Sequence, residues 1–264
     1  MSSSLKQEVF SVLGAQVTAY LPSATPDSQT PLLPATIICP GGSYQKYGVL
    51  EGRPDAMALS RAGFCVFVLS YGIGPNATHA LPLRQLSRTV SSIRKQFRRF
   101  RVDPNRIFVM GFSAGGHLAA NLGTLWNHPL LSGDGGQNRP DALCLCYPVV
   151  SLLHRPHQGT NQALLSGADE ELASLLSAER QVTSLTPPTF LWHGLDDRTV
   201  SPEHSVLFAE ALERFGVPHC LKLFPHAEHG CGLADSNRAA AEWFPEWLSF
   251  LNRTFETEAT LPSF

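Results

Sequence analysis

The sequence predicts an α/β fold with a mostly parallel central sheet and helices on both faces. Short apolar runs of the kind that form buried strands recur along the chain, and helical patterns separate them. Residues 64–71 are apolar almost throughout, as a central parallel strand requires. Between residues 82 and 100 the apolar side chains instead recur every three or four positions, which is typical of a helix packed on such a sheet.

Composition favours one domain over residues 1–264. The chain has 264 residues, of which 43% are hydrophobic and 16% charged, and this size suits one α/β domain with a full core. The net charge of −2 gives no electrostatic reason to expect a nucleic-acid partner or an acidic membrane surface. No stretch approaches the ~20 apolar residues of a membrane span, and residues 1–8 contain no apolar run of a signal peptide. We therefore expect a cytoplasmic protein whose six scattered cysteines are free thiols.

The expected elements alternate along the chain. Residues 8–21 fit one or two antiparallel strands, and residues 23–34 are rich in Ser, Thr, Pro and Asp, as an exposed loop is. Later strands are expected at 35–39, 64–71, 107–110, 142–147, 189–192 and 219–224, and helices at 54–62, 82–100, 118–125, 202–215 and 238–254. Residues 151–186 interrupt the alternation and are long enough to carry a small cap over a site.

One stretch, residues 107–118, organises the rest of the chain. An apolar strand enters Gly-x-Ser-x-Gly, and a run of small residues of helical character follows. This is the pattern of a nucleophile elbow, in which strand turns into helix so sharply that Ser113 stands clear at the top of the sheet. Gly111 and Gly115 let the two arms pass because neither has a Cβ. The N–H of Ala114, at the helix start, is expected to donate to an oxyanion.

A serine hydroxyl at neutral pH needs a base within hydrogen-bond reach and an acid that orients this base. In α/β-hydrolases the chain order is serine, acid, histidine. The acid is expected in the polar loop after the strand at 189–192, where Asp196 and Asp197 compete. Asp197 is favoured because it lies four residues after His193 and three before Val200, the register of this fold.

The base is expected in the loop after the last predicted strand. His229 immediately precedes Gly230 and is favoured over His226. The two histidines could also be read as a metal pair, but no third ligand appears at a convincing spacing, so no metal is expected. His117 and His193 lie beside motifs and are interpreted as structural.

A second oxyanion donor is expected in the glycine loop at 40–44, Pro-Gly-Gly-Ser-Tyr, which follows the strand at 35–39. The candidate donors there are the N–H groups of Gly42 and Ser43. Tyr44 and Trp192 flank the oxyanion loop and the acid loop in sequence. Each is a candidate to present an aromatic face to substrate, and a core or rim role is the alternative.

Together these motifs resemble the small bacterial acetyl esterases of the α/β-hydrolase family, which include acetylxylan and feruloyl esterase-like enzymes. The resemblance covers about residues 35 to 250. It is carried by residues 40–44, 111–119, 187–193 with Asp197, and 226–230. The family loop often reads Gly-Gly-Gly, whereas Ser43 stands at the third position here.

The resemblance implies a serine esterase that needs no cofactor and acts on a small ester, with an acetyl group and a sugar such as a xylo-oligosaccharide as the alcohol. An arylformamidase or another amide hydrolase on the same fold is the alternative. A non-catalytic binding protein is a third class, against which the complete set of Ser113, Asp197 and His229 argues. The physiological substrate and the oligomeric state stay open.

Overall fold

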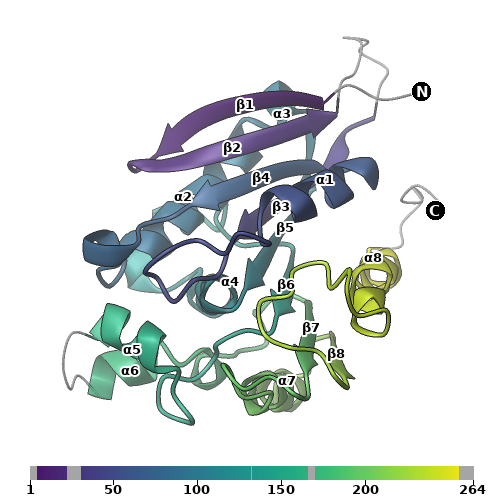
Figure 1. The fold of residues 1–264 in the computed structure, drawn as a ribbon. Helices are drawn as coiled ribbons and strands as arrows, with labels where there is room; N and C mark the ends of the chain where they lie inside the picture. The colour runs from purple at the N-terminus through teal and green to yellow at the C-terminus, as the bar shows by residue number, and fades with distance from the viewer. Residues whose placement is uncertain (1–4, 23–30, 132, 166–169, 256–264) are drawn as a thin grey trace.

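The sheet is mostly parallel, as predicted. The computed structural model describes residues 5–22, 31–131, 133–165 and 170–255. Its strands form one sheet in the order β1-β2-β4-β3-β5-β6-β7-β8 (Figure 1). Their bounds are β1 Leu5–Val12, β2 Ala15–Pro22, β3 Leu33–Cys39, β4 Cys65–Ser70, β5 Val102–Phe112, β6 Ala142–Cys146, β7 Thr189–Gly194 and β8 His219–Phe224. Only the β1–β2 and β2–β4 pairs of this sheet are antiparallel.

Helices cover both faces of this sheet (Figure 1). The α-helices are α1 Arg53–Arg61, α2 Leu81–Lys95, α3 Phe97–Phe100, α4 Ala114–Leu125, α5 Gln158–Leu165, α6 Glu170–Leu175, α7 Glu203–Arg214 and α8 Trp243–Thr254, and the 3-10 turns are η1 Gly74–Asn76, η2 Pro129–Leu131, η3 Ala178–Arg180 and η4 Ala240–Glu242. Neighbouring strand residues face opposite sides. Val109 packs in a core with residues of α2, α4 and α7, whereas Met110 packs in a second core with residues of α1 and α8.

Two predicted elements differ in detail. The helix expected over 82–100 breaks at Gln96, between α2 and α3. The strand before the elbow begins at Val102 and takes in the turn expected at 103–105. That turn persists as an irregularity, since the N–H of Asn105 donates to Asp103 (2.9 Å) and the β3–β5 register shifts there.

The stretch between β6 and β7 holds α5, α6 and η3. The start of α5 lies against the glycine loop after β3, because a Cβ on Gly159 would stand 3.1 Å from Ser43 Cβ. Residues 166–169 of this stretch, and 23–30 of the loop predicted near the N-terminus, lie outside the described residues. None of the described helices combines the length and apolar character needed to cross a lipid bilayer.

Candidate active site

Ser113 lies at a sharp turn between β5 and α4, with φ 53° and ψ −118°. A Cβ on Gly111 would stand 2.2 Å from the Gly115 carbonyl oxygen, and a Cβ on Gly115 would stand 2.1 Å from that of Cys39. Both distances are far below a van der Waals contact, so only glycine fits. The Ser113 N–H donates to the Cys146 carbonyl at 3.0 Å, which ties the strained turn to β6. The local geometry is that of the predicted elbow.

Three side chains from distant parts of the chain form one continuous line of hydrogen bonds. His229 Nε2 lies 2.7 Å from Ser113 Oγ, and His229 Nδ1 lies 2.6 Å from Asp197 Oδ2. An ionised carboxylate only accepts, so the imidazole proton is on Nδ1 and the serine hydroxyl donates to Nε2. Ser113 is 5% exposed and Asp197 7%, so the line is shielded from bulk water. This arrangement lets the imidazole take a proton from the serine.

The Asp197 carboxylate is held by more than the imidazole. Its Oδ1 accepts from the N–H groups of Thr199 and Val200, both at 2.9 Å. Its Oδ2 also lies 3.2 Å from His193 Nε2. Burial raises the pKa of Asp197, but the bonds from His193, His229 and Val200 outweigh burial and hold the pKa well below its usual value. The carboxylate therefore stays ionised beside the imidazole.

The two rival residues, Asp196 and His226, lie outside this line, and His193 and His117 occupy buried structural positions. Asp196 and His226 contact each other at 3.0 Å, and their side chains are 55% and 88% exposed. His193 is buried, with Nδ1 2.8 Å from Ser205 Oγ. His117 is buried as well, and its Nδ1 lies 3.0 Å from the Tyr44 hydroxyl. The structure thus brings together Asp197 and His229, which the sequence favoured over Asp196 and His226.

The glycine loop after β3 lies against the serine, because a Cβ on Gly41 would stand 2.9 Å from Ser113 Cβ. The Gly41 N–H donates to Glu51 Oε2 at 2.5 Å and is therefore occupied. In the described part of the chain, the N–H groups of Gly42 and Ser43 have no hydrogen-bond partner. Ala114 is the first residue of α4, where helical amides lack an intrahelical acceptor. These three amides are the candidate oxyanion donors.

Tyr44 and Trp192 are buried and do not present a ring face to a substrate in this structure. Tyr44 is 2% exposed and packs edge-on against Tyr71 at 5.5 Å. Trp192 is fully buried and stacks on Trp243, with ring centroids 5.4 Å apart. Trp192 lies in strand β7, whose side chains are all buried, so its position in sequence near the acid loop did not indicate exposure. Both environments fit a role in the core and not a role in substrate binding.

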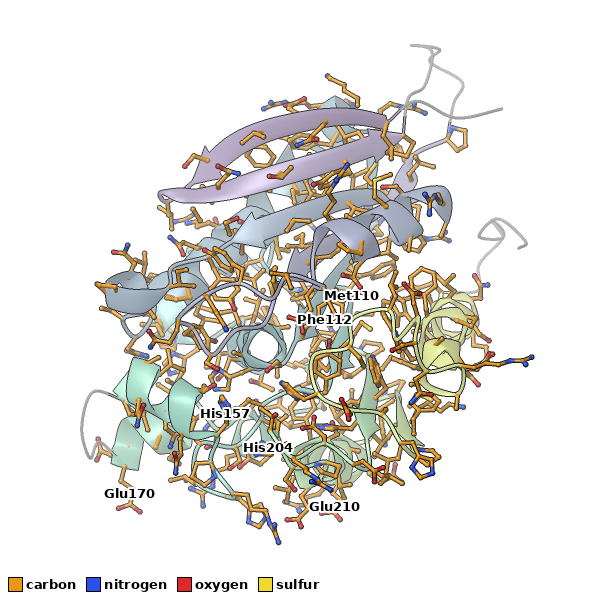
Figure 2. The ribbon with its side chains drawn as sticks, in the orientation of Figure 1. Met110, Phe112, His157, Glu170, His204 and Glu210 are labelled. Carbon is orange, nitrogen blue, oxygen red and sulfur yellow. The ribbon has the colours of Figure 1, made fainter. Side chains whose placement is uncertain are left out.

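His157, which the sequence did not mark, lies beside the glycine loop. A Cβ on Gly159 would stand 3.3 Å from His157 Cε1 and 3.2 Å from Ser43 Oγ. His157 Nδ1 lies 3.0 Å from Thr160 Oγ1 and accepts from the Thr160 N–H at 3.3 Å, which leaves the proton on Nε2. Burial and the nearby His229 lower the pKa of His157, so the ring is neutral at pH 7. Figure 2 labels it in the segment before α5.

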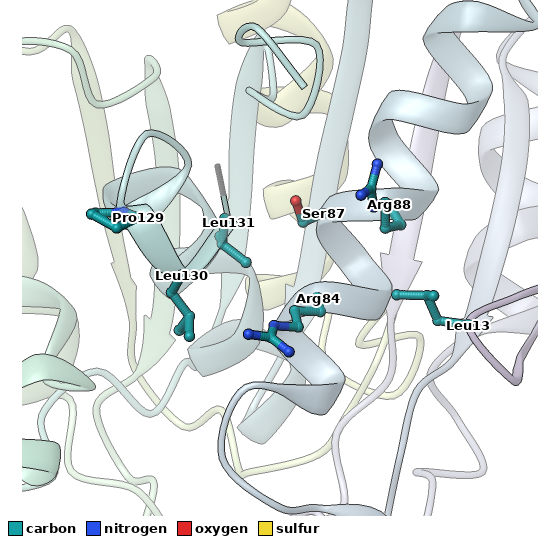
Figure 3. Close-up of a pocket in the computed structure, with 7 residues that line it drawn as sticks. All are labelled: Leu13, Arg84, Ser87, Arg88, Pro129, Leu130 and Leu131. Atoms are coloured by element: carbon teal, nitrogen blue, oxygen red, sulfur yellow. The ribbon is translucent and has the colours of Figure 1, made fainter. Parts of the chain in front are cut away.

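The described residues contain no metal-binding group but do contain a further pocket. No group of three His, Cys, Asp or Glu side chains there is arranged to hold a metal ion. A surface pocket of about 400 Å³ is lined by α2, η2 and the turn after β1 (Figure 3). Its lining residues are Leu13, Arg84, Ser87, Arg88, Pro129, Leu130 and Leu131. None of the elbow, acid-loop or histidine-loop residues contributes to it.

Comparison with known families identifies the family of the chain. The BD-FAE family matches the chain over residues 20–212. The chain belongs to the BD-FAE family of α/β-hydrolases. This family match includes β5, the elbow and the acid loop, and it ends before the loop that carries His229.

Curated relatives of this BD-FAE chain include xylan-related enzymes. The chain is 34% identical over 221 residues to endo-1,4-beta-xylanase B of Butyrivibrio fibrisolvens, covering 80% of this chain and 34% of that protein. It is 27% identical over 225 residues to the acetylxylan esterase of Xylanibacter ruminicola, covering 83% and 44%. It is 32% identical over 114 residues to the kynurenine formamidase of Danio rerio, covering 43% and 36%. The chain thus spans less than half the length of these relatives.

Two solved structures are similar over almost the whole chain. An acetyl ester-xyloside bifunctional hydrolase from Caldicellulosiruptor lactoaceticus superposes with a TM-score of 0.82 at 37% identity, covering 91% of this chain and 88% of that one. The carboxylesterase Cest-2923 from Lactobacillus plantarum has a TM-score of 0.85 at 28% identity, covering 97% and 100%. The α/β-hydrolase fold expected from the sequence is confirmed.

Proposed function

We propose that this BD-FAE chain is a serine esterase with Ser113 as nucleophile, His229 as general base and Asp197 as the orienting acid. The observation that supports this most is the line of hydrogen bonds at 2.7 and 2.6 Å from Ser113 to Asp197. It ends at a serine on a strained elbow, beside the Gly42 and Ser43 amides, which have no hydrogen-bond partner among the described residues. A buried structural serine needs neither this strain nor this partner order.

The proposed reaction follows from the positions of these groups. Ser113 Oγ attacks the ester carbonyl while His229 Nε2 takes its proton, and Asp197 stabilises the imidazolium that forms. The carbonyl oxygen becomes an oxyanion, which the N–H groups of Ala114 and of Gly42 or Ser43 stabilise. The imidazolium then protonates the leaving alcohol. Water, deprotonated by the same imidazole, hydrolyses the acyl-enzyme and returns the serine.

The substrate we propose is a short-chain ester, with an acetyl group and a sugar or xylo-oligosaccharide as the alcohol. Support comes from relatives named as an acetylxylan esterase, a xylanase and an acetyl ester-xyloside hydrolase. The helices between β6 and β7 support a short acyl group, because α5 has 8 residues and α6 has 6, too little for a large lipase-type lid.

A substrate series tests this proposal. We expect kcat/KM for p-nitrophenyl esters to be highest for acetyl and to fall towards octanoyl, and we expect turnover of acetylated xylo-oligosaccharides. A fluorophosphonate should label the wild-type protein at Ser113, and Ser113→Ala should abolish both labelling and turnover. A maximum at octanoyl or longer contradicts the acetyl assignment, and labelling retained in the variant contradicts the nucleophile.

An arylformamidase is the second candidate, because one relative is a kynurenine formamidase. The same serine, base and oxyanion donors serve amide hydrolysis, since the tetrahedral intermediate carries the same charge. Fast turnover of N-formylkynurenine with poor turnover of every ester would favour this candidate. Absence of turnover and of fluorophosphonate labelling would leave a binding protein on a hydrolase fold.

A further inference from the structure

A second buried acidic residue, Glu51, lies beside the site and is hydrogen-bonded to the glycine loop directly and to the histidine loop through Tyr147. Its Oε2 accepts from the Gly41 N–H at 2.5 Å, and its Oε1 accepts from the Tyr147 hydroxyl at 2.9 Å. The same Tyr147 oxygen accepts from the Gly232 N–H at 2.9 Å. The Tyr147 ring packs edge-on against the His229 imidazole, with centroids 5.0 Å apart. One carboxylate therefore connects the glycine loop to the histidine loop.

The chemistry of this connection requires two acceptors at one point. Glu51 is 7% exposed, and no cation pairs with it among the described residues. A buried carboxylate without a cation is costly unless its oxygens are hydrogen-bonded. Both partners of Glu51 donate, and a carboxylate offers two acceptor oxygens where an amide offers only one. The two donors thus explain why a carboxylate, and not an amide, stands at position 51.

The fit around this carboxylate is tight. A Cβ on Gly41 would stand 2.6 Å from Glu51 Oε2, and a Cβ on Gly48 would stand 2.4 Å from it. Backbone without side chains therefore encloses the carboxylate on two sides. Because Gly41 is also adjacent to Ser113, a shift of Glu51 moves the backbone that borders the nucleophile.

We propose that Glu51, acting with Tyr147, is a positioning residue that holds the oxyanion loop and the His229 loop in register with Ser113. The inference rests on the proposed function. By occupying the Gly41 N–H, Glu51 fixes the orientation of the next peptide unit and leaves the Gly42 N–H to face the oxyanion. Through Tyr147 it anchors Gly232, three residues after His229, and packs the ring against the imidazole.

Three variants and one control test this role in the full chain. Glu51→Ala removes both acceptors, Glu51→Gln keeps one, and Tyr147→Phe removes the hydroxyl but keeps the ring. Asp55→Asn is the control, because Asp55 is a buried carboxylate on α1 whose Oδ2 accepts from the Gly52 N–H, and no hydrogen bond among the described residues joins it to either loop. End-point fluorophosphonate labelling counts intact sites, kcat and KM are measured on an acetyl ester, and a trifluoromethyl ketone reports affinity for a tetrahedral oxyanion.

We expect Glu51→Ala to lower kcat per labelled site about 10- to 100-fold, the scale of a small misplacement of catalytic groups. The affinity for the trifluoromethyl ketone should fall by the same factor, while KM changes little. Glu51→Gln and Tyr147→Phe should lose less, since each keeps part of the connection. Asp55→Asn should keep wild-type kcat per site and ketone affinity.

The outcomes separate the inference from the proposed function. If Glu51→Ala does not fold, the test rests on Glu51→Gln and Tyr147→Phe. Lower ketone affinity per labelled site in these variants supports the positioning role, because reduced stability alone does not lower the affinity of sites that are intact. Wild-type kcat and ketone affinity in these variants, or a loss no larger than in Asp55→Asn, overturns the positioning role alone. A wild-type protein that neither reacts with fluorophosphonate nor turns over any ester overturns both proposals.

Discussion

Replacing Asp197 with asparagine tests the proposed triad at the point where the structure constrains it most. In the wild-type protein Oδ1 accepts from two backbone N–H groups, those of Thr199 and Val200, and Oδ2 faces His229 Nδ1. In Asp197→Asn the amide oxygen must keep the Oδ1 position to satisfy the two N–H groups. The amide NH2 then faces Nδ1 and donates to it. The imidazole proton is forced onto Nε2, which can no longer accept from Ser113.

The size of the loss in kcat can be estimated from the cost of turning the new amide to its alternative orientation. Turning the amide would restore the active tautomer but would set its NH2 against both backbone donors. Each donor left without a partner costs about 1–3 kcal/mol, so the turned amide is disfavoured by about 2–6 kcal/mol. This corresponds to a population lower by a factor of about 30 to 2 × 10⁴. We expect kcat to fall by at least the lower factor, towards the loss of about 10⁴ known for a triad with the wrong tautomer.

The assay is kcat for an acetyl ester, normalised to labelled sites, with Asp196→Asn as the control. The control makes the same chemical change one residue away, at a carboxylate whose hydrogen bond is with the exposed His226. We expect it to retain nearly all activity. A loss below tenfold in Asp197→Asn, or a larger loss in Asp196→Asn, would refute the proposed role of Asp197.

Three further predictions concern the elbow, pH and metal. Gly115→Ala should lower the thermal denaturation midpoint strongly, because the new Cβ would stand 2.1 Å from the Cys39 carbonyl oxygen. An unchanged midpoint would show that the elbow has space for a methyl group. Burial raises the pKa of Asp55 to about 7, whereas its pKa in the unfolded chain is near ~4. Protonated Asp55 therefore contributes its full stability to the fold below pH ~4, and this contribution is lost as pH rises to about 7. Asp55→Asn should therefore gain stability relative to wild type between pH 4 and 8 in denaturant titrations, and a pH-independent difference would argue against this. Dialysis against a chelator should leave kcat unchanged, and a loss restored by zinc would revive a metal role for His226 and His229.

Much of the fold was predictable because its central parallel strands, such as β3, β6 and β7, are buried on both faces. The run at 64–71 corresponds to β4, and the run at 189–192 begins β7. The break at Gln96 was not predictable, because the apolar spacing continues across it from Ile93 to Phe97 and Phe100. The apolar stripe records which face is buried, and it carries no information about where the backbone hydrogen bonds are interrupted.

The residues of the site also divide into those that sequence motifs predicted and those that they did not. Ser113, Asp197 and His229 each lie in a local motif, and the order of those motifs along the chain indicated which residues would meet. Glu51 has no such motif, and its partners lie 10 and 96 residues away. Burial of Trp192 and Tyr44 likewise depends on neighbours such as Trp243 that are distant in sequence. Contacts of this kind become visible only once the chain is folded.

The charges in the site indicate why the proposed role of Glu51 is geometric. During acylation a negative charge forms on the carbonyl oxygen and a positive charge forms on His229. Glu51 is connected to the loops on both sides, so its own charge would disfavour the first and favour the second, and the two effects oppose each other. Asp197 differs because it contacts the imidazole directly at 2.6 Å, and hydrogen bonds hold its pKa low, whereas burial raises the pKa of Glu51. Removing the charge of Glu51 while keeping an acceptor should therefore cost less than removing its side chain, which is the order expected for Glu51→Gln and Glu51→Ala.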